Sequence, residues 1–118
     1  MNTPTPDLDL RLAVAKTMPE KYPNARINKL LGYVVYYVDG AVLGTPYFDL
    51  SFDAILPLVR GLSDEEFMRL MNLLQYNCEY VSLVYYLARQ ATPADYCRAY
   101  LAAKEQTTPA PQAKEDSK

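Results

Sequence analysis

The hydrophobic pattern of the chain is densest across residues 31–48, where two apolar runs flank the dipeptide Asp39-Gly40. Asp-Gly between β-branched and aromatic runs is typical of a two-residue type I′ turn, because glycine adopts positive φ without a steric penalty. In the first run, residues 33–38, the alternate positions of both faces are apolar or aromatic. A strand with one solvated face alternates apolar with polar residues instead. The pattern therefore predicts a β-hairpin whose faces are both covered, or one of whose faces is an adhesive surface.

Two further stretches bear on the predicted sheet. The second hairpin strand, residues 41–48, contains Gly44 and Pro46, and because proline cannot donate to a ladder we expect an edge strand or a bulge. Residues 20–29 are polar and indicate a loop with a short edge segment at Ile27. Residues 76–89 fit either a continuation of the preceding helix or a strand. Their density of Tyr, Val and Leu favours a strand over residues 79–88, which would pair with the hairpin.

Helical signals occupy most of the remaining chain. Residues 6–18 and 52–60 carry apolar stripes at helical spacing. Ser63 and Glu66 form a capping-box pattern before the amphipathic run 67–74. Thr92 is the expected N-cap of a last helix over residues 93–104. The sequence thus predicts helices both before and after the hairpin.

The predicted element order is α-β-β-α-α-β-α. A small sheet with two apolar faces and several amphipathic helices predicts an α+β fold, in which a three-stranded antiparallel sheet is covered by helices on both faces. We expect a flexible N-terminus over residues 1–5 and a single domain over residues 6–105. Residues 106–118 are small, polar and rich in proline, so we expect a disordered tail there.

Composition removes several classes of function. The chain has no histidine among its 118 residues, so His-based metal sites and His-activated nucleophiles are excluded. The net charge of −2 argues against binding to a phosphate backbone, so nucleic acid is not an expected partner. The longest apolar stretch, 30–38, is far shorter than the ~20 residues that cross a bilayer, and no signal-peptide pattern opens the chain. We expect a cytoplasmic protein that does not bind membranes and keeps Cys78 and Cys97 reduced.

Carboxylates and thiols have structural interpretations in this sequence. Asp49 and Asp53 flank one helix start, and three more carboxylates, residues 64–66, open the next helix. These five groups raise the possibility of a Mg²⁺ site, but helix N-termini attract acids through the macrodipole alone, and we favour capping. Two cysteines without histidine fall short of a structural zinc site. We therefore expect no catalytic residues, no metal and no cofactor.

Tyrosine is the unusual component, with 11 copies. Several lie on the two predicted strands with the strongest pattern, and core packing under helices is their expected role. If one face stays open, it becomes an interaction site, and Tyr36 and Tyr86 are our candidate interaction residues. Arg98, in the second turn of the last predicted helix, is the candidate residue for an anionic ligand.

Three segments resemble the small phage proteins of the α/β/α (ABA) sandwich family. They are LDLRLAVAKTMPEKY at residues 8–22, YFDLSFDAILPLVRGL at 47–62 and ARQATPADYCRAYLAA at 88–103. Within the last, Thr92-Pro93 and Cys97-Arg98-Ala99 follow the family's closing helix. The resemblance implies a tailed-phage or prophage origin, and we therefore expect the cytoplasm of the host cell as the location. It implies no activity.

We therefore expect a phage-encoded, non-enzymatic binding protein that contacts a host or phage protein, with inhibition of a host or defence protein as one form. A binder of a nucleotide-like small molecule and a structural protein of the virion or its assembly are the alternatives. Self-association through the edge strand near residues 41–44 is compatible with each of them.

Overall fold

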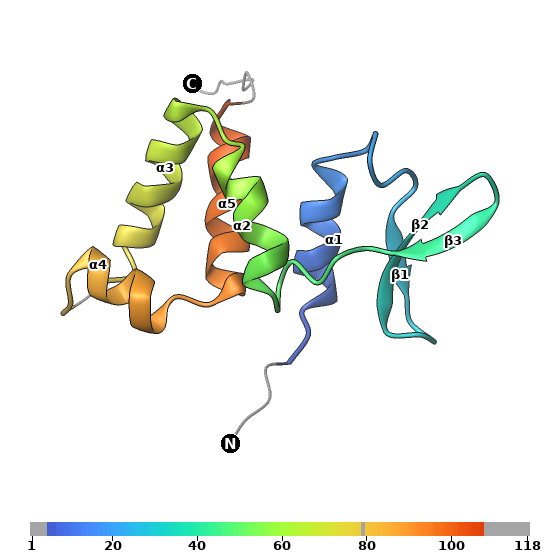
Figure 1. Cartoon of the computed structure of the whole chain (residues 1–118), viewed down its shortest axis with the longest axis horizontal. Helices are drawn as coiled ribbons and strands as arrows, with labels where there is room; N and C mark the ends of the chain where they lie inside the picture. The colour runs from blue at the N-terminus through green and yellow to red at the C-terminus, as the bar shows by residue number, and fades with distance from the viewer. Residues whose placement is uncertain (1–4, 79, 108–118) are drawn as a thin grey trace, which may run out of the picture.

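The structure of the chain is a computed structural model, which describes residues 5–78 and 80–107. Helices and one sheet form separate regions of the molecule, and the sheet lies at the end farthest from α3 and α4 (Figure 1). Along the chain the elements are α1 (Leu8–Lys16), β1 (Arg26–Asn28), β2 (Tyr33–Val38), β3 (Ala41–Gly44), α2 (Phe52–Arg60), α3 (Asp64–Gln75), α4 (Leu83–Tyr85), the π-helical turn η1 (Tyr86–Gln90) and α5 (Pro93–Thr107). The α+β class with a three-stranded antiparallel sheet is confirmed.

The sheet has the order β1-β2-β3, with both pairs antiparallel. β2 and β3 are joined through Asp39 and Gly40, whose φ angles are +52° and +81°. Positive φ at both central residues is the requirement of a type I′ turn, so the predicted hairpin is confirmed. β3 ends at Gly44, before Pro46, because proline has no N–H for the ladder.

The helical body holds the main hydrophobic core. α5 lies beside α1, α2 and α3 and packs against each of them (Figure 1). Val14 from α1, Ile55 from α2, Leu70 from α3 and Cys97 from α5 are all completely buried in this core. Local signals fix the helix starts. Ser63 and Glu66 form the predicted capping box, and Thr92 accepts a hydrogen bond from the backbone N–H of Asp95.

The prediction of a strand over residues 79–88 is wrong, and so is the element order that contained it. Where this segment is described, it contains α4 and η1, and the third strand of the sheet is β1, around Ile27. Ser82 caps α4 by accepting a hydrogen bond from the N–H of Tyr85 at 3.2 Å. Leu83, Tyr86 and Leu87 face the core at helical spacing. Capping and core contacts thus outweigh the β propensity of the segment.

The prediction that helices cover both faces of the sheet also requires correction. α1 packs against β1 and β2, and the rest of the helical body lies beyond α1 (Figure 1). The side of β2 that carries Val34 and Tyr36 faces this body, whereas Tyr33 on the other side is 42% exposed. The physical reason is that the predicted third strand, which would have brought neighbouring helices onto the second face, is itself helical.

The first helix begins, and the last helix ends, slightly later than predicted. α1 begins at Leu8 rather than residue 6, because the Asp7 side chain accepts a hydrogen bond from the N–H of Leu10 and serves as N-cap. α5 continues to Thr107, two residues into the predicted tail. Residues 1–4 of the predicted flexible N-terminus and 108–118 of the predicted tail lie outside the described residues.

Candidate functional site

The side of the sheet that points away from the helical body forms a surface that we call the tyrosine face. The cross-strand pair Tyr37–Val42 places both side chains on this side, because directly opposite residues share a face, and the Val35 side chain lies on the same side opposite Gly44. Leu31 and Tyr47 flank it and line the same hollow as Tyr33 and Val35. The members of the tyrosine face are Leu31, Tyr33, Val35, Tyr37, Val42 and Tyr47.

The tyrosine face is apolar and open. Val42 is 51% exposed, Tyr47 44% and Tyr33 42%, while Val35 is only 2% exposed and forms the floor. A shallow hollow of about 360 Å³ lies over these residues. Because scattered single apolar side chains are normal on a surface but a contiguous group is not, this face is a candidate interaction site.

Polar contacts hold two of its rings in place. Arg26 of β1 donates from Nε and Nη2 to the Tyr37 hydroxyl at 2.9 and 2.6 Å. The guanidinium carbon of Arg11 lies 4.2 Å from the centre of the Tyr47 ring. The Tyr33 and Tyr47 rings lie beside each other, with centroids 6.4 Å apart. Arginine side chains from β1 and α1 thus hold the Tyr37 and Tyr47 rings in place.

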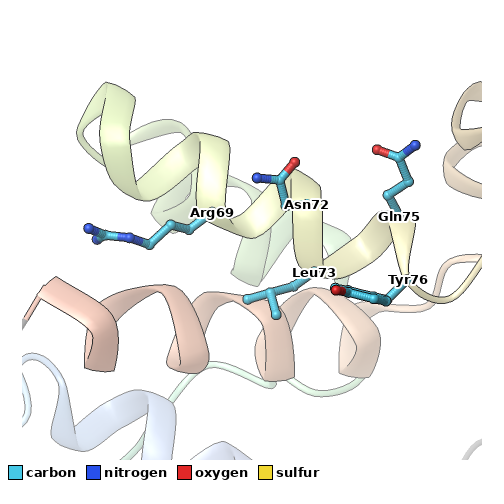
Figure 2. A pocket seen from close by; sticks show the side chains of 5 residues that line it. All are labelled: Arg69, Asn72, Leu73, Gln75 and Tyr76. Carbon is cyan, nitrogen blue, oxygen red and sulfur yellow. The ribbon is translucent and has the colours of Figure 1, made fainter. Parts of the chain in front are cut away.

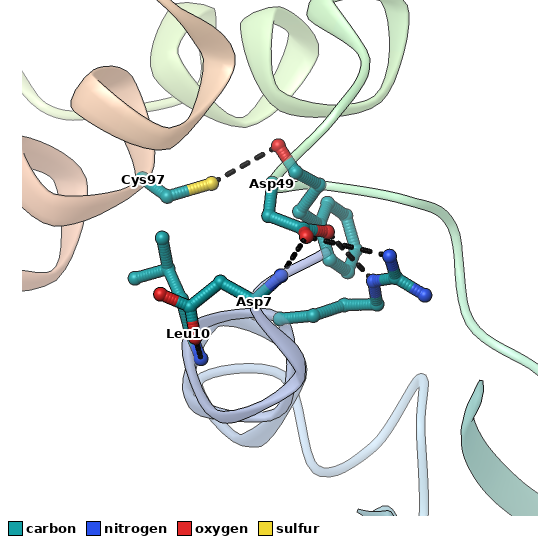
Figure 3. A network of polar contacts seen from close by, with 6 residues as sticks. Asp7, Leu10, Asp49 and Cys97 are labelled. Atoms are coloured by element: carbon teal, nitrogen blue, oxygen red, sulfur yellow. Dashed lines mark hydrogen bonds and ion pairs between the residues drawn. The ribbon is translucent and has the colours of Figure 1, made fainter. Parts of the chain in front are cut away.

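A buried ion pair supports the Tyr47 side of this face (Figure 3). Arg11 of α1 donates from Nε to Oδ1 of Asp49 at 2.6 Å and from Nη2 to Oδ2 at 3.3 Å. The backbone N–H of Asp7 donates to the same carboxylate at 2.7 Å. The Arg11 and Asp49 side chains are 2% and 1% exposed. This pair joins α1 to the segment between β3 and α2, and no sequence pattern singled out Arg11.

Tyr36 and Tyr86, the two predicted interaction residues, lie away from the tyrosine face. Tyr36 faces the helical body and is half-buried, with its ring edge-to-face against Tyr22 at 5.0 Å between centroids. Tyr86 is 5% exposed and accepts a hydrogen bond from the Asn77 side chain at 3.1 Å. Burial raises the pKa of Tyr86 above its ordinary value. Their binding roles stay predictions, while the exposed tyrosines of the tyrosine face are Tyr33 of β2 and Tyr47 of the segment that follows β3.

Arg98, the predicted ligand residue, lies on the outer side of α5. It lines a hollow of about 190 Å³ together with Asn77 and Asp95. Its Nη1 lies 3.4 Å from Oδ1 of Asp95, so its charge already has a partner within the same helix. The structure brings Arg98 close to neither Tyr36 nor the tyrosine face, and its role as a ligand residue stays a prediction.

A second hollow, of about 560 Å³, runs along α3 (Figure 2). Leu73 points towards α5 and the exposed Tyr76 side chain runs towards Leu73, whereas Asn72 and Gln75 point away from α5 (Figure 2). Arg69 at one end donates to Glu65 at 2.6 Å. Binding sites for small molecules have convergent polar groups around an apolar pocket. The side chains here diverge, and we place no ligand in this hollow.

Metal and thiol chemistry find little support among the described residues. Within residues 5–78 and 80–107 no group of three or more His, Cys, Asp or Glu side chains could hold a metal ion. Asp49, one of the carboxylates considered for Mg²⁺, is instead paired with Arg11. Cys97 is completely buried, and its thiol donates to the carbonyl oxygen of Phe48 at 3.0 Å. Burial, with a smaller effect of the Asp49 charge, raises the pKa of Cys97 to about 12, which makes it a poor nucleophile.

The raised pKa of Cys97 predicts a loss of stability in alkali. In the unfolded chain the thiol ionises near its ordinary value of 9.0, while in the folded protein it stays protonated until about pH 12. The contribution is therefore complete below pH 9 and declines as the pH rises from 9 to 12. Between pH 8 and pH 10 the free energy of unfolding should fall by about 1.4 kcal/mol through this group. Urea unfolding at several pH values measures the slope.

The quantity to compare between variants is the slope of the free energy of unfolding against pH, not the free energy at any one pH. Tyr22, Tyr86 and Tyr96 also have pKa values raised by burial, and they add a decline of the same sign above pH 10. Cys97→Ala should keep the tyrosine part and lose the remainder. Equal slopes for the parent protein and Cys97→Ala would contradict the prediction.

The comparisons with known proteins add no assignment. No helix in the described part of the chain is long and apolar enough to cross a membrane. No family model, no curated protein and no solved structure matches the chain. An inference about function must therefore start from the geometry of the structure itself.

Proposed function

We propose that this chain is a non-enzymatic protein that binds another protein through the tyrosine face. The observation that carries the proposal is the exposure of Tyr33, Val42 and Tyr47 around the buried floor residue Val35. Tyrosine combines a large apolar ring with a polar tip, and it is enriched in the centre of protein interfaces. In this proposal the helical body at one end stabilises the fold, and the open aromatic sheet at the other end recognises the partner.

Charge favours a protein over other partners. The members of the tyrosine face are all uncharged, and the chain as a whole has a net charge of −2. Binding of single-stranded nucleic acid combines aromatic stacking with a cationic groove. Arg26 of β1 is directly opposite Val35, so it places one exposed cation on this side of the sheet, where it donates to the Tyr37 hydroxyl. An aromatic face with one cation from β1, already bonded to Tyr37, and no cationic groove fits an apolar protein surface.

The fixed rings also lower the cost of binding. Ordering a flexible side chain at an interface costs about 0.5–1.5 kcal/mol. The Tyr37 hydroxyl is held by Arg26, and the Tyr47 ring lies against the guanidinium of Arg11. A partner would therefore meet rings that are already positioned.

The finer expectation is that the partner is a host or phage protein, met in the cytoplasm of a bacterial host, with inhibition of a host or defence protein as the biological result. Its support is the resemblance to the phage ABA sandwich proteins. Binding of a nucleotide-like molecule through Arg98 and a structural role in virion assembly are the alternative proposals. Neither alternative rests on the exposed residues of the tyrosine face.

Matched charge substitutions test the proposed face. We expect Tyr33→Glu combined with Val42→Glu to weaken capture of a bacterial host protein at least tenfold relative to the parent chain, because two desolvated contacts at the centre of the face are lost. The control combines Tyr80→Glu with Val84→Glu, which are 95% and 77% exposed outside this face. It introduces the same residue types and the same charge.

Affinity capture followed by quantitative mass spectrometry is the measurement, with thermal unfolding to show that all three proteins are folded. Proteins retained by the parent and the control but lost from the face variant support the proposal. Equal retention by the face variant, or no protein retained by the parent chain, would contradict it.

A further inference from the structure

The outer edge of β3 offers a second kind of contact. All four residues of β3 are exposed, and among the described elements its sheet neighbour is β2. In a two-residue hairpin the residues that flank the turn form the first hydrogen-bonded pair, and such pairs then alternate along the ladder. The bond from the N–H of Thr45 to the carbonyl of Val34 agrees with this alternation. The backbone groups of Val42 and Gly44 therefore point outwards.

This edge lacks the usual protection against strand pairing. Natural edge strands carry lysine, proline, a bulge or an inward-pointing charge. Ala41–Gly44 has the sequence AVLG, with no charge and no proline. Val42 and Leu43 are 51% and 43% exposed. An uncharged apolar edge of this kind fits another strand.

A second copy of the chain fits this edge in two antiparallel registers. A two-fold axis perpendicular to the sheet keeps each face on its own side, so Val42 can lie opposite only residues of the tyrosine face in the second copy. Val42 then lies opposite either Val42 or Gly44 of the second copy. In the second case the axis passes between the two Leu43 residues.

The space above Gly44 selects the register centred on Leu43. A Cβ built on Gly44 would meet no atom within 4 Å. Gly44 also lines the hollow of about 360 Å³ on the tyrosine face. With Leu43 on the axis, the side chain of Val42 enters this hollow beside Gly44 of the second copy. With Val42 on the axis, Gly44 faces Gly40 and the hollow stays empty.

Electrostatics permits the same pairing. Asp39 is the charged residue of the hairpin turn, four positions from Leu43. In the register centred on Leu43, the two Asp39 residues lie about 26 Å apart along the strands, at about 3.3 Å per residue. This separation exceeds the Debye length of ~8 Å at physiological ionic strength. The two copies therefore meet without repulsion at the edge.

We propose that two copies of this chain pair through β3 in the register centred on Leu43, which forms a continuous six-stranded antiparallel sheet with both tyrosine faces on one side. The pairing does not depend on the proposed function, and it would bury Val42 while it leaves the Tyr33 and Tyr47 rings of both copies on the same side of the sheet. Stable interfaces bury roughly 800 Å² per partner. A four-residue edge buries less, so the dimer should be weak and should dissociate on dilution.

Sedimentation velocity over a range of protein concentrations tests the dimer. The parent chain should shift from monomer to dimer as its concentration rises through the micromolar range. Val42→Lys places a charge in the hollow beside Gly44 and should remain monomeric. Val38→Lys makes the same change at a residue that is 40% exposed on the other face of the hairpin, and it should dimerise like the parent. A parent chain that is monomeric at every concentration would overturn the proposal.

Cysteine cross-linking tests the register. With Cys78 replaced by alanine, Leu43→Cys should form a disulfide between two copies under mild oxidation, because directly opposite non-hydrogen-bonded residues lie within reach of a disulfide. Val42→Cys should cross-link no faster than the exposed control Val38→Cys, since the two copies of residue 42 would be separated by about 8 Å, beyond the ~7 Å limit. Faster cross-linking through residue 42 than through residue 43 would overturn the register.

Discussion

Asp49→Ala is expected to lower the free energy of unfolding by about 3–5 kcal/mol, because it leaves the Arg11 guanidinium buried without its counter-ion. The two side chains are 2% and 1% exposed, so solvent cannot take the place of the lost carboxylate. The backbone N–H of Asp7 also loses its acceptor. Chemical denaturation of the purified protein measures the loss. Asp53→Ala is the matched control, since Asp53 is exposed in the first turn of α2 and should cost below about 1 kcal/mol.

A double variant separates the effect of the unpaired Arg11 charge from the effect of losing the other contacts of Asp49. Asp49→Ala combined with Arg11→Leu removes both members of the ion pair, and apolar replacement of a whole buried pair is tolerated better than loss of one member. We expect the double variant to be more stable than Asp49→Ala alone. The opposite order, with the two losses simply adding, would show that the pair is not coupled as its geometry requires.

The hairpin could be predicted because its signals are local. Asp39 and Gly40 determine the turn through φ angles that few other residue pairs adopt, and the flanking runs determine the strands. The same holds for the caps, where Ser63 with Glu66 and Thr92 with Asp95 satisfy free backbone groups within four residues. These elements depend on no contact from a distant part of the chain.

The third strand could not be assigned from local signals. Residues 79–88 have a composition that suits a pleated sheet, yet the buried position of Tyr86 and the cap at Ser82 select helical turns. β1 is short and polar, and its pairing of Ile27 with Val34 depends on the hairpin beside it. Tertiary contacts therefore decide both assignments, as is common for β propensity.

The candidate site, too, was predictable only where it depends on local sequence signals and not on tertiary contacts. The sequence identified a sheet rich in tyrosine and an alternative in which one face stays open, but it placed the weight on Tyr36 and Tyr86. Which face of β2 is covered depends on where α1 packs, and this places Tyr36 towards the body and Tyr33 outwards. The sequence signal for the tyrosine face was that Tyr33, Val35 and Tyr37 alternate along one strand and so lie on one side of it. The Arg11–Asp49 pair had none, because its members are separated by 38 residues.

Phe48→Ala should lower the free energy of unfolding by about 3–5 kcal/mol through loss of apolar burial and creation of a cavity. Phe48 is 1% exposed, and its ring lies edge-to-face against Tyr22 with centroids 6.0 Å apart. It belongs to the segment between β3 and α2, so its ring anchors the sheet to the helical body. Its carbonyl also accepts the thiol of Cys97 from α5.

Phe67 provides the control for this prediction, because it is a phenylalanine of α3 that is 38% exposed. Phe67→Ala should cost about 1 kcal/mol. For a domain of this size each kcal/mol lowers the melting temperature by about 4–8 °C, so the two variants should differ clearly in a thermal scan. Equal melting temperatures would contradict the anchoring role of Phe48. Hydrogen exchange adds a second measurement, since loss of the anchor should speed exchange across β2 and β3 more than across α5, whereas Phe67→Ala should not separate the sheet from the body.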